Sequence, residues 1–128
     1  MVAARLGTSG EVELSNAGHV PPILQNGRIN HLPPDGVPLG LFCQSAYTSQ
    51  SLFLDRGDRL VLVTDGLIES TDGRGAEYGI DALSSLVEAN PRIWPCDLTN
   101  LLLEDATRFR KGRPPDDDTT LMVVQRTD

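Results

Sequence analysis

The chain has 128 residues, of which 39% are hydrophobic and 23% are charged, values typical of one soluble globular domain with a modest core. Its formal net charge of −7 argues against nucleic acid and against anionic membranes as partners, because both carry charge of the same sign. No apolar run is long enough to span a membrane and the first residues do not resemble a signal peptide, so we expect a cytoplasmic protein.

Short strands and turns are predicted at the start of the chain. Residues 11–15 alternate polar and apolar side chains, which is typical of a half-buried strand. Residues 23–25 and 28–32 flank an Asn-Gly dipeptide, the strongest short signal for a hairpin, so these two segments are predicted to pair. Residues 33–40 are rich in proline and glycine, which indicates an irregular loop.

The middle of the chain is predicted to contribute two more strands. A strand over residues 46–54 is expected to pair with one over residues 59–64, across a turn at residues 56–58. Residues 70–79 contain three glycines and several polar side chains, so they are predicted to form a surface loop.

Two helices and a final strand are predicted in the last part of the chain. Apolar residues follow helical spacing over residues 80–87, and an Asn-Pro pair at positions 90 and 91 ends that helix. Asp97 is the predicted N-cap of a second helix that ends before Gly112. The apolar face of this helix would consist of Leu98, Leu101, Leu102 and Phe109. With a last strand over residues 119–124, the order of elements indicates an α+β fold with a largely antiparallel sheet.

A few single side chains carry weaker expectations. Cys43 and Cys96 have no spacing typical of a zinc site, and both are expected to be small buried hydrophobic residues. Trp94 is expected to pack in the core or between helices. His19 is expected to cap a turn through its own hydrogen bonds, and His31 to be structural.

Acidic residues occur where two predicted strands meet loops. Asp65 follows the apolar run at residues 60–63, and three aspartates at residues 116–118 precede the strand at 119–124. If these strands are antiparallel, both acidic segments lie at the same edge of the sheet. Carboxylates gathered there would repel one another, and a hard divalent cation is the usual relief. The alternative is that both segments are simply solvated strand ends.

Five short motifs, in this order, together resemble one protein family. The resemblance is to bacterial metal-dependent serine/threonine phosphatases of the protein phosphatase 2C superfamily, in the branch of stage II sporulation protein E and the stress-response sigma-factor regulators. The motifs lie at residues 16–22, 38–40, 57–60, 64–69 and 117–120.

The resemblance implies an α-β-β-α sandwich, in which two antiparallel sheets are flanked by helices. Residues 1–128 would be a single domain that corresponds to the C-terminal half to two-thirds of the family's catalytic domain. The implied substrate is a phosphorylated regulatory protein of the anti-sigma-factor antagonist type.

The resemblance also implies which residues bind metal. Asp65 and Asp117 match the family's metal ligands and would act in catalysis through the bound ions, with Asp118 beside them as a further candidate ligand. The implied cofactors are two Mn²⁺ or Mg²⁺ ions, and both metals favour carboxylate oxygens. Such a pair of ions holds and deprotonates a water that attacks phosphorus in line.

One part of the family's pattern is missing. The family's first metal-bridging aspartate lies well upstream of the motif at Asn16, whereas only 15 residues precede Asn16 here and none is Asp. We therefore expect this chain alone to be inactive. Without the upstream segment the sandwich would also lack strands and leave apolar faces and strand edges open, so we expect homo-oligomers. Two alternatives are a non-catalytic regulatory or protein-interaction module that keeps the phosphatase fold, and a metal-stabilised structural domain without phosphate chemistry.

Overall fold

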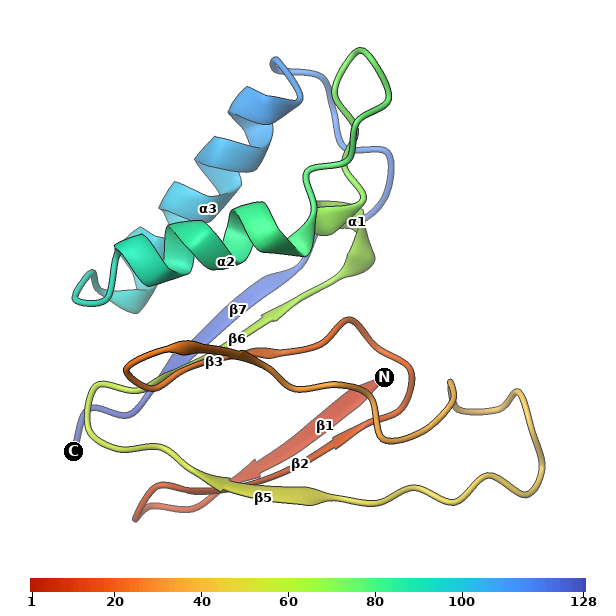
Figure 1. Cartoon of the computed structure of the whole chain (residues 1–128), viewed down its shortest axis with the longest axis vertical. Coiled ribbons are helices and arrows are strands. Elements are labelled where there is room, and N and C mark those ends of the chain that lie inside the picture. The colour runs from red at the N-terminus through yellow and green to blue at the C-terminus, as the bar shows by residue number, and fades with distance from the viewer.

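Two antiparallel sheets form the centre of the molecule, as the computed structural model of residues 1–128 shows (Figure 1). The first sheet has the strand order β1-β2-β5, with β1 at Val2–Leu6, β2 at Glu11–Asn16 and β5 at Gln50–Phe53. The second has the order β4-β3-β6-β7, with β3 at Ile23–Gln25, β4 at Ile29–His31, β6 at Arg59–Val63 and β7 at Leu121–Gln125. The expected α+β fold with antiparallel sheets is confirmed.

Three helices follow β6 in the chain. α1 spans Asp65–Ile68, α2 spans Ile80–Ala89 and α3 spans Pro95–Phe109. Helices α2 and α3 lie over the outer face of the four-stranded sheet, while the outer face of the three-stranded sheet carries no helix (Figure 1). None of the helices combines the length and the hydropathy that a membrane crossing requires.

Apolar side chains form two layers, one on each side of the second sheet. The layer between the two sheets consists of Val12, Leu14, Leu24, Leu32, Leu54, Leu60 and Leu62. The layer between the second sheet and the helices consists of Ile23, Val61, Val63, Leu67, Tyr78, Leu83, Val87, Leu98, Leu102 and Ala106. Strand β6 is buried at all five residues because it contributes to both layers. Each fully buried aliphatic side chain stabilises the fold by roughly 1.5–3 kcal/mol.

The hairpin predicted at the Asn-Gly dipeptide is confirmed. Strands β3 and β4 pair antiparallel with Leu24 opposite Asn30. Gly27 has a φ of 81°, a left-handed conformation that glycine adopts without steric cost.

The predicted pairing of residues 46–54 with residues 59–64 is wrong. Strand β5 pairs with β2 in the first sheet, whereas β6 pairs with β3 and β7 in the second. The physical reason is burial, because β6 is apolar on both faces and needs a central position, while β5 is half exposed. The turn between them therefore carries the chain from one sheet to the other. Strand β1 was not predicted, since four of its five residues are exposed and show no alternation.

Three further expectations about single residues are wrong. Asp97 is not the N-cap of α3, because Trp94 occupies that position and Pro95 begins the helix, where a proline without N–H costs least. Asp97 lies in the first turn instead, where a negative charge favours the helix dipole. Trp94 is 67% exposed rather than packed. Cys43 and Cys96 are both exposed, one in the long loop before β5 and one at the solvent-facing start of α3.

Candidate functional site

The two acidic segments lie side by side at one edge of the second sheet. Strands β6 and β7 pair antiparallel with Val63 opposite Leu121, so the end of β6 meets the start of β7. Thr64 extends this pairing, because its N–H donates to the Thr120 carbonyl at 3.0 Å and its Oγ1 accepts the Thr120 N–H at 2.8 Å. The same hydroxyl donates to the Asp118 carbonyl at 3.0 Å. The residue just before Asp65 is thus tied by direct hydrogen bonds to the main chain at Asp118 and Thr120.

Gly66 brings the two segments into close contact. A Cβ atom at this position would lie 2.5 Å from the Asp118 carbonyl oxygen and 3.0 Å from that of Asp117. Only glycine allows the two backbones to approach so closely without a shift. Helix α1 therefore begins directly against the segment that contains the other candidate ligands.

The carboxylates of Asp65 and Asp117 are each half engaged with the protein. Asp65 Oδ1 accepts the Gly66 N–H at 3.0 Å, and Asp117 Oδ1 accepts the Asp118 N–H at 2.7 Å. Both residues are exposed, and the second oxygen of each makes no hydrogen bond to the protein. Each side chain is thus oriented by one oxygen and presents the other to solvent.

Asp116 and Asp118 differ in their contacts. Asp116 Oδ2 accepts the Thr71 hydroxyl at 3.1 Å, so this residue ties the acidic segment to the loop after α1. Asp118 is exposed and its carboxylate has no hydrogen-bond partner in the protein, which leaves it available as a further ligand.

The donors present fit a hard divalent cation in chemical type but not in number. Neither acidic segment has a cationic partner, because the two ion pairs of the chain, Arg5–Glu13 and Arg108–Asp105, lie elsewhere. No three carboxylate, histidine or cysteine side chains are arranged so that they could hold one ion. Since such ions take six or more oxygen ligands, Asp65 and Asp117 supply only part of a site, and water or another segment must supply the rest.

Two polar side chains behind the acidic edge were not singled out from the sequence. Ser70 Oγ donates to the Gly66 carbonyl at 2.8 Å, and Arg110 Nη1 donates to Ser70 Oγ at 3.2 Å. Both Ser70 and Arg110 are buried. No local pattern could have revealed them, because the contact joins residues 40 positions apart.

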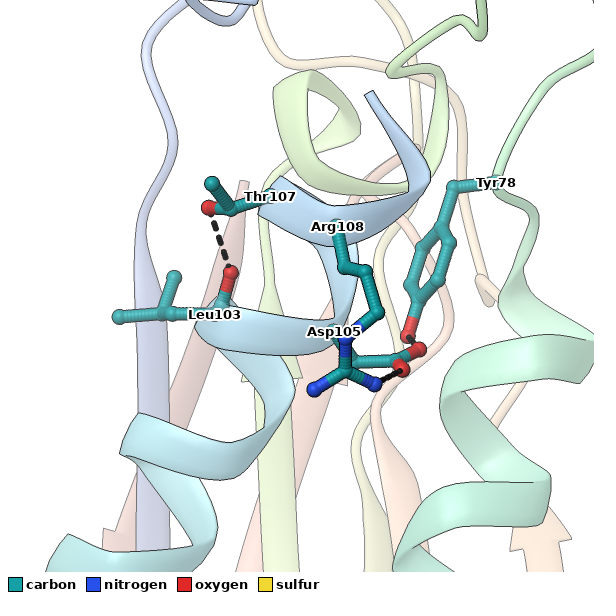
Figure 2. A network of polar contacts seen from close by, with 5 residues as sticks. All are labelled: Tyr78, Leu103, Asp105, Thr107 and Arg108. Atoms are coloured by element: carbon teal, nitrogen blue, oxygen red, sulfur yellow. Dashed lines mark hydrogen bonds and ion pairs between the residues drawn. The ribbon is translucent and has the colours of Figure 1, made fainter. Parts of the chain in front are cut away.

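The loop after α1 is also attached to helix α3 (Figure 2). The Tyr78 hydroxyl donates to Asp105 Oδ2 at 2.8 Å, and Arg108 Nη1 donates to Asp105 Oδ1 at 3.1 Å. The ring of Tyr78 meets that of Phe109 edge to face, with centroids 5.4 Å apart. Burial, with Asp105 beside the hydroxyl, raises the pKa of Tyr78 above its ordinary value of 10.0, so the donor stays protonated at neutral pH.

Asp72 orders the tip of the same loop. Its Oδ1 accepts the N–H groups of Arg74 and Ala76 at 2.7 and 3.0 Å. These backbone donors, the Arg74 N–H first, lower the pKa of Asp72 below its ordinary value of 3.8. Asp72 therefore acts in the loop and is not part of the acidic edge.

The two histidines make contacts of a structural kind. The main-chain N–H of His19 donates to Asn16 Oδ1 at 2.8 Å, and Asn16 Nδ2 donates to the His19 carbonyl at 3.1 Å, which closes the turn after β2. The ring Nδ1 of His19 lies 2.9 Å from the Val20 carbonyl. The ring Nε2 of His31 lies 2.8 Å from Ser84 Oγ on α2. Both agree with the expected roles.

The chain is similar in sequence and fold to known proteins. Residues 3–127 match the family described as stage II sporulation protein E (SpoIIE). A curated relative, Protein IcfG from Synechocystis sp., is 26% identical over 121 residues, which make up 93% of this chain and 19% of that protein.

Two solved structures resemble the chain along nearly its whole length. The RsbU and RsbW domains of Rv1364c from Mycobacterium tuberculosis are 31% identical with a TM-score of 0.81, over 98% of this chain and 35% of that one. The manganese-presoaked phosphatase domain of the cell fate determinant SpoIIE from Bacillus subtilis is 19% identical with a TM-score of 0.78, over 99% of this chain and 56% of that one. At 19% identity the second similarity shows the fold alone. The chain spans less than two thirds of each of these relatives.

Proposed function

This chain belongs to the stage II sporulation protein E family, and on that premise we propose that it is part of a metal-dependent protein serine/threonine phosphatase. One observation carries the proposal. Asp65 and Asp117 come from separate parts of the chain, yet they meet at one exposed edge of the sheet. Gly66, the residue after Asp65, allows this because it lies directly against the carbonyl oxygens of Asp117 and Asp118. The similarity to the phosphatase domain from Bacillus subtilis supports the fold that such an activity requires.

Asp65 and Asp117 would hold Mn²⁺ or Mg²⁺, and Asp118 would be the additional ligand. When bound, such ions activate a water for in-line attack on phosphorus and neutralise the charge of the phosphate. The protein's own part is to orient each carboxylate by one hydrogen bond, from the Gly66 N–H to Asp65 and from the Asp118 N–H to Asp117, which leaves one oxygen of each free for the ions. Thr64 fixes the spacing of the two segments.

The proposed substrate is a phosphorylated regulatory protein of the anti-sigma-factor antagonist type. The similarity to the RsbU and RsbW domains supports a regulatory partner. The exposure of both aspartates supports a protein substrate, because a phosphorylated side chain on a folded surface can reach them without entering a deep cavity. The net charge of −7 makes nucleic acid and anionic membranes unfavourable partners.

A second candidate function is a non-catalytic protein-interaction module that retains the phosphatase fold. The lack of any three side chains placed to hold one ion favours it. The two functions differ in their dependence on metal. A phosphatase site must bind Mn²⁺ through Asp65 and Asp117, whereas an interaction module has no need of either carboxylate.

Thermal unfolding with and without Mn²⁺ tests the metal site. An ion that binds only the folded state stabilises it by about 2.7 kcal/mol at a hundredfold excess over Kd, so Mn²⁺ is expected to raise Tm. Asp65→Asn and Asp117→Asn are each expected to remove most of that rise. Asp97→Asn, an equal change of charge on the exposed start of α3, is the matched control and should keep it. An equal response of all four proteins would contradict the proposed site.

A further inference from the structure

Two arginines, Arg59 and Arg110, are buried although neither has an acidic partner. Arg59 is fully buried at the start of β6, and Arg110 is 7% exposed at the end of α3. Burying a charged group is costly unless its donors are used, so each guanidinium must have a specific set of acceptors. The acceptors of Arg59 lie near the start of β6 and those of Arg110 near its end, so Arg59 can serve as the control for Arg110 in an experiment.

Arg59 serves the connection between α2 and α3. It donates to the carbonyl oxygens of Asn90, at 2.9 Å, and of Ile93. A weaker contact of 3.5 Å joins it to Gln25 Oε1. None of these acceptors belongs to the acidic edge.

Arg110 joins three different parts of the chain with three donors. Its Nη1 donates to Ser70 Oγ, its Nε to the Arg113 carbonyl and its Nη2 to Thr107 Oγ1, each at 3.2 Å. The first acceptor lies just after α1, the second on the segment that leads to residues 116–118, and the third on α3 itself. The planar guanidinium suits this task, because its donors point in fixed and divergent directions.

The contact with Ser70 reaches the turn that contains Asp65. Ser70 Oγ passes the connection on by donating to the Gly66 carbonyl at 2.8 Å, one residue from Asp65. Thr119 Oγ1, from the opposite segment, makes a weaker contact of 3.5 Å with the same carbonyl.

The contact with Arg113 reaches the other acidic segment. Arg113 Nη2 donates to the Thr71 carbonyl at 2.7 Å, and the Thr71 hydroxyl donates to Asp116 Oδ2 at 3.1 Å. Arg110 is thus connected to both sides of the acidic edge. The hydrogen bonds through Ser70 are buried, whereas the two that lead from Arg113 to Asp116 are exposed.

We propose that Arg110 is a positioning residue for the metal site, which fixes the Asp65 turn relative to residues 116–118 through Ser70 and Arg113. The inference rests on the proposed function, because it assumes that the acidic edge binds a divalent cation. Arg110 reaches Gly66 only through the Ser70 hydroxyl, so it would contact neither the metal nor the substrate itself. Its loss would leave the ligands in place but let their separation vary, and supporting side chains of this kind set metal affinity.

The test compares Arg110→Met with Arg59→Met, and adds Ser70→Ala. Each arginine variant removes a buried guanidinium of similar size, so both should lower Tm. Only Arg110→Met and Ser70→Ala are expected to weaken Mn²⁺ binding, by roughly tenfold or more in Kd, as the loss of a supporting contact does at metal sites. Ser70→Ala removes a single hydroxyl and decides the question if Arg110→Met does not fold.

Amide hydrogen exchange of the metal-free protein gives a second, independent readout. In Arg110→Met and Ser70→Ala, exchange should accelerate at Gly66 and Thr120 while the centre of β6 stays protected. In Arg59→Met those two amides should behave as in the wild type.

Equal Mn²⁺ affinity in Arg110→Met and Arg59→Met, with equal exchange at Gly66 and Thr120, would overturn the role of Arg110. If the wild type binds no Mn²⁺ but the exchange pattern appears as expected, the proposed function fails while Arg110 is still shown to hold the edge together. The two failures are therefore distinguishable.

Discussion

The absence of a side chain at Gly66 determines how closely the segments that carry the candidate ligands approach each other. Gly66 lies against the carbonyl oxygens of Asp117 and Asp118, and any Cβ atom there would overlap them. Gly66 does not have a positive φ, so the requirement comes from the neighbouring backbone and not from the conformation of the residue itself.

Gly66→Ala is expected to destabilise the fold by about 1–3 kcal/mol, because the added methyl must push two backbone segments apart. It should also weaken the response of Tm to Mn²⁺. Gly73→Ala is the matched control, since a Cβ at that position meets nothing within 4 Å. Urea unfolding of both variants measures the difference, and equal stabilities would show that the edge is not tightly packed.

At the scale of elements, the loop after α1 depends on helix α3. Tyr78 is buried in the layer between the second sheet and the helices, and its hydroxyl is hydrogen-bonded to Asp105 on α3. Because residues 70 and 71 of this loop contact Gly66 and Asp116, its attachment to α3 also helps to fix the acidic edge.

Tyr78→Phe should lower the free energy of unfolding by about 1–2 kcal/mol, since it removes a partly buried hydrogen bond to a carboxylate. A double-mutant cycle with Asp105→Asn isolates the interaction. Additive effects of the two substitutions would mean that the hydrogen bond contributes nothing.

The same hydroxyl predicts a dependence on alkaline pH. The folded-state pKa of Tyr78 is raised above 10.0, so its contribution to stability is complete below that pH and is lost as pH rises above it. Urea unfolding at neutral pH and above pH 10.0 should therefore show a smaller loss of stability in Tyr78→Phe than in the wild type. An identical loss in both proteins would assign the alkaline sensitivity to other groups.

For the whole molecule, the sandwich is open along one side. Met122 lies opposite Leu62 in the β6–β7 pair, and Leu6 lies opposite Val12 in the β1–β2 pair. Residues directly opposite one another share a face of the sheet, so Met122 and Leu6 both point toward the layer between the sheets. They are nevertheless 51% and 49% exposed, because neither is covered by the opposite sheet.

The edge strands β1 and β7 carry these residues, and each has an unpaired backbone edge. We therefore predict that the 128-residue chain associates with itself in solution. Light scattering should show species larger than a monomer, and Met122→Glu or Leu6→Glu should shift the equilibrium toward the monomer. Trp94→Glu, which changes an exposed side chain elsewhere, should have no such effect.

The same chain is predicted to hydrolyse a phosphoserine peptide slowly or not at all, because the acidic edge alone supplies too few ligands to hold a pair of ions. A monomer that turns over the peptide at the rate of a complete phosphatase domain would refute both expectations.

The sequence alone determined the features that depend on neighbours along the chain. The Asn-Gly hairpin between β3 and β4, the helical spacing of α2 and the two acidic strand ends could all be predicted, because turn chemistry and hydrophobic periodicity act over a few residues. Asp65 and the run at residues 116–118 were candidates for the same reason, since each lies where an apolar strand meets a loop, while the choice of Asp117 within the run came from the family resemblance.

Only the tertiary structure decided which sheet each strand joins and which polar side chains lie inside. The short turn between β5 and β6 predicts a hairpin. The two strands nevertheless join different sheets, because β6 is apolar on both faces and must be covered on both. Arg110 and Gly66 looked ordinary in sequence, and their roles come from acceptors and carbonyls about 40 to 50 residues away. Burial of a charge and close approach of two backbones are set by distant partners, so local sequence patterns do not reveal them.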